Sequence, residues 1–299
     1  MKEIKFTTKY EPVLFVADKE FKEQYNNRVG DNSDYKQKID GEVKYLAVCP
    51  RCNNPVVILG IFKKIRVAPH ARHAKGISIP NVAQYDEYKF LHCPYHRKKA
   101  DYIREYVPET EEPQRQELYR IAKEHYDKAI YLLQKYTGIR ITKQMMENLA
   151  ENYAEMRVYN YIDATIYNIP WYLVYGFDGF QMYHMIVRKD TTLYRHLRNL
   201  GFVLRDSRIQ GHVYIENNES YLLKAVNYRY VVDKNDNLEE WLDFSILRPD
   251  ETVIDTLLYV AVDRFSIPVD SYYFGNLVNY KDWKPNQLAL EIAKSCMNP

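Results

Sequence analysis

The sequence predicts an α+β protein, in which a cysteine- and histidine-rich module with a β-hairpin precedes a helical region and then a mixed region. Three observations support this fold class. The alternating run at 43–48 leads directly into a Cys-Pro-Arg-Cys turn. Apolar residues recur at helical spacing between 114 and 159. From 202 onward, alternating strand patterns are mixed with further helical ones. Mixed periodicities of this kind indicate an α+β architecture.

The amino-acid composition limits the class of protein to which the chain can belong. The chain has 299 residues, 46% of them hydrophobic and 27% charged, which is ordinary for a globular protein. Its net charge of +2 creates no strong overall field toward nucleic acid or anionic lipid, so any basic patch must be local. Because the first residues are charged and include no apolar run, we expect no secretory signal, and no apolar run is long enough to span a membrane. Scarce cysteine favours the reducing cytosol, so we expect a cytoplasmic protein.

We expect three segments. Residues 1–105 form the cysteine- and histidine-rich module, residues 114–160 a helical hairpin, and residues 161–299 a mixed α+β domain. The first boundary lies in a linker bounded by Pro108 and Pro113, because proline interrupts regular structure.

The first segment should consist mainly of short strands. Strands are expected at 4–8, 13–16 and 43–48, and a hairpin at 55–62 and 64–67 that returns the chain toward the Cys-Pro-Arg-Cys turn. The polar stretch 18–41 is interpreted as a surface loop with a turn at 29–32, and 81–91 as helical.

The later segments should begin with two helices. One spans 114–136 and ends at Gly138, and the next begins after the N-cap Thr142. Pro170 should end the element that precedes it. Further helices are expected at 180–187, 191–200, 251–263 and 285–294, and strands at 202–206, 212–216, 228–232 and 241–246.

A metal site is the strongest prediction. Three of the four cysteines and four of the eight histidines fall within one segment of fewer than fifty residues. Cys49 and Cys52 have the two-residue spacing of a zinc knuckle, and Cys93 is the natural third thiolate. The fourth ligand is open. His96 repeats the spacing as Cys-x-x-His, whereas His70 and His73 resemble the histidine pair of a Cys2His2 site.

Residues 49–93 also resemble the zinc module of CoiA-like bacterial competence proteins. The shared pattern is Cys-Pro-x-Cys, a hairpin, a histidine pair followed by Lys75-Gly76, and a later cysteine. This chain has His70-Ala71-Arg72-His73 where those proteins typically show His-Phe-Ala-His. The resemblance implies that His73 or His70 holds zinc together with Cys49, Cys52 and Cys93, and it implies a DNA-processing setting.

The expected zinc is structural, because a site filled by four protein ligands leaves no position for a reactive water. An alternative is that the surplus histidines hold a second, open metal. Nuclease chemistry would need clustered carboxylates and a lysine. Glu42-Val43-Lys44 fits that tripeptide, with Asp34 or Asp40 upstream, but such tripeptides arise by composition alone.

Two groups of basic residues are candidates for contacting nucleic acid. Around the zinc segment, basic residues clearly outnumber acidic ones, and the candidates are Arg72, Lys75, Arg97, Lys98 and Lys99. The second group lies where 191–216 has the order of a winged helix, with Arg205 and Arg208 near phosphates. The competing interpretation of that segment is an amphipathic helix packed on a sheet.

The sequence therefore predicts a protein that binds DNA or RNA and carries a structural zinc site. Two alternatives remain: a metal-dependent nuclease of CoiA-like type, and a component of a multi-protein system that binds a protein partner through its tyrosine-rich surface. The 29 tyrosines suit cores, interfaces and base stacking equally well.

Overall fold

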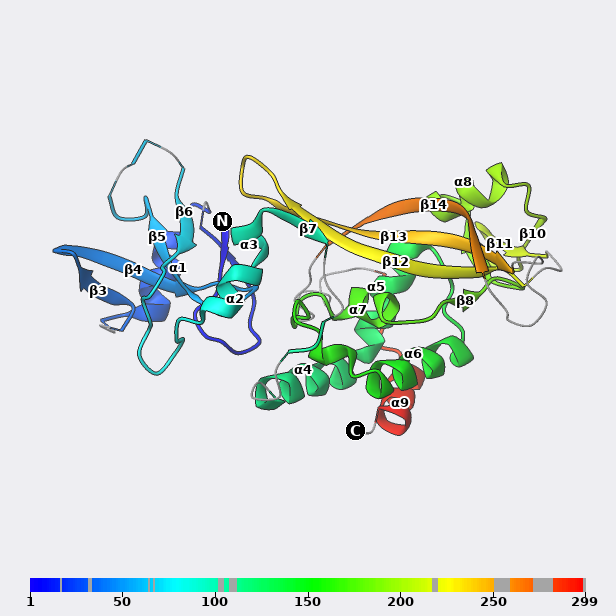
Figure 1. The fold of residues 1–299 in the computed structure, drawn as a ribbon, viewed down its shortest axis with the longest axis horizontal. Coiled ribbons are helices and arrows are strands. Elements are labelled where there is room, and N and C mark those ends of the chain that lie inside the picture. Colours follow the sequence, from blue (N-terminus) through cyan, green and yellow to red (C-terminus); the bar gives the residue numbers. More distant parts are fainter. Residues whose placement is uncertain are drawn as a thin grey trace. The chain divides into compact units, whose positions relative to one another are not determined.

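The fold is α+β, as predicted (Figure 1). The structure is a computed structural model that describes residues 1–16, 18–31, 34–63, 65–66, 68–101, 105–107, 112–216, 220–249, 259–270 and 282–297. The chain forms two compact units. The first contains Met1–Ala100 together with Tyr230–Glu239, and the second contains Asp101–Arg229 together with Glu240–Pro299. The N-terminal segment predicted at 1–105 lacks residues 230–239, which belong to the first unit.

An antiparallel sheet is the centre of the first unit. Its strands follow the order β3 (Lys36–Ile39), β4 (Glu42–Val48), β5 (Pro55–Leu59) and β6 (His70–His73). The short strands β1 (Glu3–Ile4) and β2 (Leu14–Phe15) pair with each other. The unit also contains the helices α1 (Phe21–Val29), α2 (Glu87–His92) and α3 (Pro94–Arg97).

The expected loop at 18–41 is wrong, because α1 and β3 lie within it. In α1, Phe21, Tyr25 and Val29 follow one another at four-residue spacing and are buried, so they form the single apolar stripe of an otherwise polar helix. The Tyr25 hydroxyl donates to the carbonyl of Leu46 on β4 at 3.0 Å, which ties the helix to the sheet.

The prediction of a strand at 43–48 is confirmed by β4, but the expected hairpin is only half right. Its first strand is β5. The second strand is β6, whereas residues 65 and 66 lie outside any strand and residues 64 and 67 lie outside the described residues. The predicted helix at 81–91 is shorter and occupies Glu87–His92.

Helices form a layer in the second unit: α4 (Glu112–Glu124), α5 (Tyr126–Thr137), α6 (Lys143–Glu155), α7 (Ile169–Tyr175) and α9 (Gln287–Cys296). The single helix predicted at 114–136 is interrupted at His125. The caps are confirmed: Gly138 has φ 74° at the end of α5, and the Thr142 hydroxyl accepts from the Met145 amide. The prediction for Pro170 is wrong. It begins α7, where its missing N–H costs no helical hydrogen bond.

The large sheet of the second unit has the strand order β14 (Tyr259–Val269), β13 (Leu238–Pro249), β12 (Leu222–Val232) and β7 (Lys99–Asp101), and β8 (Phe180–Gln181) also pairs with β12. β12 and β13 extend the strands predicted at 228–232 and 241–246. The helix predicted at 251–263 is wrong over 259–263, which lie in β14, and 251–258 lie outside the described residues.

A smaller sheet has the order β10 (Leu204–Asp206), β11 (His212–Ile215) and β9 (Ile186–Arg188), with α8 (Thr192–Asn199) between β9 and β10 in the chain. The predicted helix and hairpin are confirmed here. The helix predicted at 180–187 is wrong, since those residues belong to β8, β9 and the turn between them. No helix among the described residues is both long enough and apolar enough to cross a bilayer.

Candidate metal centre

Four side chains from three separate segments meet at one point in the first unit. Cys49 and Cys52 lie in the turn between β4 and β5, His73 ends β6, and Cys93 follows α2. The antiparallel register explains the position of His73. It is the Cα partner of Val56, close to the start of β5, so the returning strand places its imidazole beside the cysteine turn.

The geometry fits a tetrahedral ion. The ligand atoms of Cys49, Cys52, His73 and Cys93 all lie within 4.8 Å of one another. The sulfur atoms of Cys49 and Cys93 are 3.7 Å apart, and Cys52 sulfur is 3.3 Å from His73 Nε2. Zinc–sulfur bonds of about 2.3 Å put the sulfurs of a tetrahedral site about 3.8 Å apart. These four residues can therefore hold a metal ion.

Asn54 fixes the surroundings of the site. Its buried side chain donates from Nδ2 to Cys52 sulfur at 3.4 Å and accepts at Oδ1 from the Asp86 amide at 2.7 Å. Asp86 caps the N-terminus of α2, the helix that leads to Cys93. One amide side chain thus links the cysteine turn to the segment that carries the third thiolate, as outer-shell residues of metal sites do.

The turn itself depends on a left-handed residue. Asn53 has φ 59°, and its amide donates to the Cys49 carbonyl at 3.0 Å. The Cys49 amide in turn donates to the Asn54 carbonyl at 2.8 Å. Asparagine tolerates this conformation better than most residues, which explains how a chain without glycine here closes the turn around Cys49 and Cys52.

The thiols of Cys49, Cys52 and Cys93 are buried close together, and this environment changes the pKa of each. Burial raises the pKa of Cys52 and of Cys93 well above the usual value. Burial also opposes ionisation of Cys49, but hydrogen bonds from Cys52 and Cys93 and the adjacent His73 outweigh it and lower the pKa of Cys49. Three thiolates can coexist here only if a cation compensates their charge, and a divalent metal supplies that compensation.

Lys5 contributes a second positive charge beside the site. Its backbone pairs with Val48, the residue before Cys49, and only 1% of its surface is exposed. Burial lowers the pKa of Lys5 to about 8, while the charges of Cys49, Glu11 and Cys52 act in the opposite direction. The Lys5 ammonium donates to the carbonyls of Thr8 and Lys9, each at 3.3 Å.

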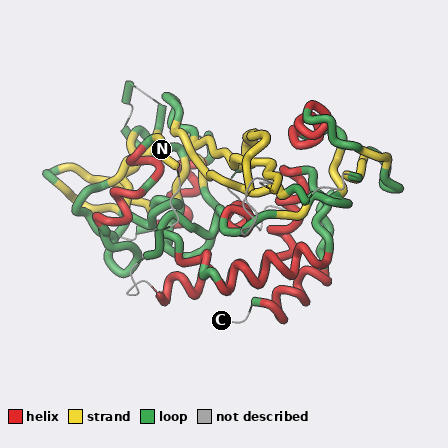
Figure 2. The backbone as a smooth tube through the Cα atoms, turned by 45° about the vertical axis from the view of Figure 1, so that its right-hand side comes forward, coloured by secondary structure: helices red, strands yellow, loops and turns green. Residues whose placement is uncertain are grey.

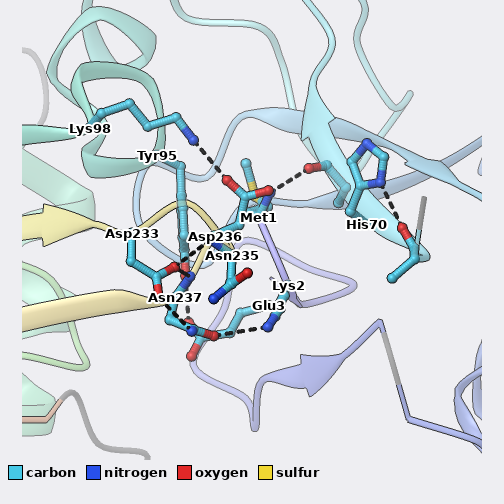
Figure 3. Close-up of polar contacts among 12 residues, drawn as sticks. Met1, Lys2, Glu3, His70, Tyr95, Lys98, Asp233, Asn235, Asp236 and Asn237 are labelled. Carbon is cyan, nitrogen blue, oxygen red and sulfur yellow. Dashed lines mark hydrogen bonds and ion pairs between the residues drawn. The ribbon is translucent and has the colours of Figure 1, made fainter.

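The other two candidate histidines, His70 and His96, do not belong to the group of four ligands. His70 pairs with Leu59, three residues along the strand from His73 and therefore about 10 Å away. Its Nδ1 lies 3.0 Å from the Ala68 carbonyl (Figure 3). The His96 ring lies against Phe90, with ring centroids 4.0 Å apart, and burial lowers its pKa. His73 is therefore the histidine that the fold brings to the three cysteines.

A second, open metal site is not formed within the described residues. Apart from the Cys3His group, no three His, Cys, Asp or Glu side chains there converge on one point. The candidate nuclease tripeptide also lacks a cluster: Glu42 and Lys44 form an exposed ion pair at 2.8 Å on β4.

The end of the β12–β13 hairpin is fixed close to this centre. The Val232 amide donates to the Lys98 carbonyl at 2.6 Å, directly after α3. The Asp236 carboxylate accepts from Lys98 Nζ at 2.9 Å and lies 3.4 Å from the Met1 amine (Figure 3). Val232 also belongs to the buried cluster that contains Cys49, Cys52 and Cys93. No sequence signal near 230–239 points to this arrangement.

The predicted basic residues of the first unit occupy different environments. Lys98 pairs with Asp236, and Lys75 pairs with Glu87 at 3.0 Å. Arg97 is half-buried on α3. Arg72 and Lys99 are exposed, and no acidic group among the described residues lies within ion-pair distance of either. These two residues keep their charge available to a partner.

In the second unit, Arg205 on β10 pairs with Glu216, which directly follows β11. Arg208 is exposed in the β10–β11 turn. Helix α8 buries Leu193 and Leu197, whereas Leu200, directly after the helix, is 39% exposed. The Nδ1 atom of His196 lies 2.6 Å from the Asp263 carboxylate on β14, and the His196 ring stacks on Phe265. One side of α8 is therefore packed against β14, as in the competing interpretation.

Comparison with known proteins finds no match. No family model fits the chain, and neither the curated proteins nor the solved structures contain a significant relative. The resemblance of residues 49–93 to CoiA-like proteins therefore stays a prediction.

Two residues beside the metal ligands were not predicted from the sequence. Asn54 and Lys5 are polar and fully buried, but the sequence alone places neither beside the cysteines. The Asn53-Asn54 pair directly after Cys52 is the one local signal that was available, because asparagine favours left-handed turns.

Proposed function

We propose that this protein binds nucleic acid through a basic surface of its first unit, and that a zinc ion held by Cys49, Cys52, His73 and Cys93 stabilises that unit. Sulfur-rich four-ligand sets favour zinc among the common divalent metals. Because protein atoms fill all four positions, the zinc has a structural role and activates no water.

The distribution of charge carries the nucleic-acid part of the proposal. Residues 49–100 contain ten Lys and Arg but two Asp and Glu, whereas the whole chain has a net charge of +2. The remainder of the chain is therefore acidic, and the positive charge is concentrated around the metal centre. A localised excess of this kind attracts the phosphate backbone and makes affinity depend steeply on salt.

Arg72 and Lys99 provide the test. Lys38 offers a matched control, because it is exposed in the same unit on β3, at the opposite edge of the sheet from β6. We expect Arg72→Glu with Lys99→Glu to weaken binding of a DNA duplex at low salt and to reduce the slope of log affinity against log salt by about two. Lys38→Glu should change both quantities much less.

Fluorescence anisotropy with labelled duplex, read at several salt concentrations, measures both quantities. If the wild-type protein shows no binding of DNA or RNA at low salt, the proposal is refuted. Equal effects of the Arg72/Lys99 and Lys38 substitutions would show that binding, where present, does not use this surface.

A further inference from the structure

A row of aromatic rings crosses one face of the small sheet in the second unit. Tyr214 lies on the central strand β11, between its Cα partners Arg205 on β10 and Ile186 on β9. His212 faces Arg188 on β9 in the same way. Directly opposed residues of antiparallel strands point to the same face of the sheet, so these side chains share one surface.

The opposite face is the buried one. Val187, Val213 and Ile215 alternate with the first set and are at most 3% exposed. Helix α8 packs near β9 and buries Leu193 and Leu197 (Figure 2). The period-two alternation therefore separates a buried apolar face from a face that carries Tyr214, His212, Arg188 and Arg205.

The β8–β9 turn adds two rings to this face. The Met185 amide donates to the Met182 carbonyl, so Tyr183 and His184 occupy the centre of the turn. Both are exposed, Tyr183 to 52%. The centroids of the Tyr183 and His184 rings are 3.8 Å apart, and those of His184 and Tyr214 are 6.0 Å apart. The three rings thus form a continuous row.

His184 adopts φ 58°, a left-handed conformation in which glycine or asparagine is easier to accommodate. Its amide donates to the Ile215 carbonyl at 2.9 Å, which holds the turn against β11. The turn therefore contains a strained backbone conformation, and two aromatic rings lie in solvent beside Tyr214. The packing of the core does not require this arrangement.

Charge around the rings favours an anionic partner. Between residues 183 and 216, six Lys and Arg stand against three Asp and Glu. Ion pairs neutralise Arg188 with Asp190, Lys189 with Asp206 and Arg205 with Glu216. The excess is carried by three exposed arginines. Arg195 and Arg198 lie on α8, whereas Arg208 lies in the β10–β11 turn of the small sheet itself.

We propose that this face of the small sheet, formed by Tyr183, His184 and Tyr214, binds single-stranded nucleic acid by stacking bases on its rings. The inference rests on the proposed nucleic-acid function and names the class of ligand. The rings are tilted against one another, by 44° between Tyr183 and His184 and by 45° between His184 and Tyr214, so each can receive the π-face of a separate unstacked base. Arg208 in the β10–β11 turn of the same sheet offers a positive charge to the phosphates. A duplex hides those faces within its own stack, so it gains nothing from the rings.

The experiment compares two double variants in the full chain. Tyr183→Leu with Tyr214→Leu removes the phenol rings and keeps apolar bulk, whereas Tyr183→Phe with Tyr214→Phe keeps the rings. Each stacked base contributes about 1–3 kcal/mol, so the leucine variant should bind oligothymidylate or oligouridylate at least roughly 5-fold more weakly. The phenylalanine variant should bind like the wild type, and duplex affinity should stay unchanged in both.

Anisotropy titrations with the labelled single strands and a duplex read these affinities, and thermal melting checks that each variant is folded. Single-strand affinity of the folded leucine variant equal to that of the wild type overturns the inference and leaves the proposed function intact. An equal loss for duplex and single strand also overturns it. A wild-type protein that binds neither form refutes the proposed function itself, and the inference with it.

Discussion

Replacing Cys93 with serine should unfold the first unit and leave the second unit folded. Serine is a poor zinc ligand, so Cys93→Ser removes one of the four bonds that hold the ion. The matched control is Cys296→Ser, which makes the same chemical change in α9 of the second unit, at a cysteine that does not belong to the group of metal ligands.

The magnitude follows from what zinc supplies. Structural zinc contributes roughly 10–16 kcal/mol of apparent binding free energy at neutral pH. A whole domain is typically stable by about 5–15 kcal/mol. In the first unit the site joins β4, β5, β6 and the segment after α2, so loss of the ion should remove most of the free energy that keeps these elements together.

The structure also predicts which residues distant in sequence lose their protection from hydrogen exchange in Cys93→Ser. Lys98, which accepts from Val232 and pairs with Asp236, lies directly after the short helix α3 that begins at Pro94. Residues 230–239 should therefore lose protection together with the first unit, although they follow it by more than a hundred positions in the sequence.

Hydrogen exchange measured by mass spectrometry resolves these regions. In Cys93→Ser, peptides from 42–59, 70–73 and 230–239 should exchange rapidly, whereas peptides from α5 and α7 keep wild-type protection. Zinc content should fall with the protection, and Cys296→Ser should match the wild type in both. Retained protection of β4 and β5 in zinc-free Cys93→Ser would refute the reasoning.

Three further predictions test separate parts of the account. Asn54→Ala, which removes the donor to Cys52 sulfur, should weaken zinc affinity by roughly 10–100-fold in a chelator competition, whereas Asn53→Gly, which suits the left-handed turn, should not. Gly138→Ala should lower the melting temperature of the second unit more than Gly211→Ala. Both positions have φ near 74°, but a Cβ at Gly138 would collide with the Thr191 side chain, whereas a Cβ at Gly211 meets no atom within 4 Å; equal losses would contradict this. Burial raises the pKa of several core tyrosines, so the stability they provide is complete below the unfolded value of about 10 and is lost as pH rises above it. Exposed tyrosines such as Tyr183 should titrate first in alkali. The remaining tyrosinate absorbance should then rise together with the loss of circular dichroism, and ionisation of every tyrosine well before unfolding would contradict the burial.

The metal ligands were predictable because coordination chemistry restricts residue type and spacing. Cys49, Cys52 and Cys93 followed from thiolate spacing alone. The choice among the histidines depended on strand register, which the sequence left open. Because β6 itself is the partner of β5, His73 lies near the turn and His70 three residues farther along.

The errors in the fold have similar physical causes. Helix α1 carries one narrow apolar stripe, Phe21, Tyr25 and Val29, which its polar neighbours obscure in a window average. Pro170 is compatible with the start of a helix as well as with its end, and only the flanking structure decides. The strand β14 was mistaken for a helix because its pairing with β13 is a long-range property.

The position of residues 230–239 in the first unit could not be predicted from local patterns. A polar turn at the end of a hairpin normally faces solvent. Here Asp236 meets Lys98, and Val232 enters the buried cluster around the cysteines, so contacts distant in sequence determine the division of the chain.

X-ray absorption at the zinc edge of the purified full-length protein tests the metal centre most directly. The account predicts one zinc per chain with three sulfur neighbours at about 2.3 Å and one nitrogen neighbour at about 2.0–2.1 Å. The account is contradicted if the protein, purified without metal chelators, contains no zinc. It is also contradicted if oxygen atoms dominate the first coordination shell of the zinc.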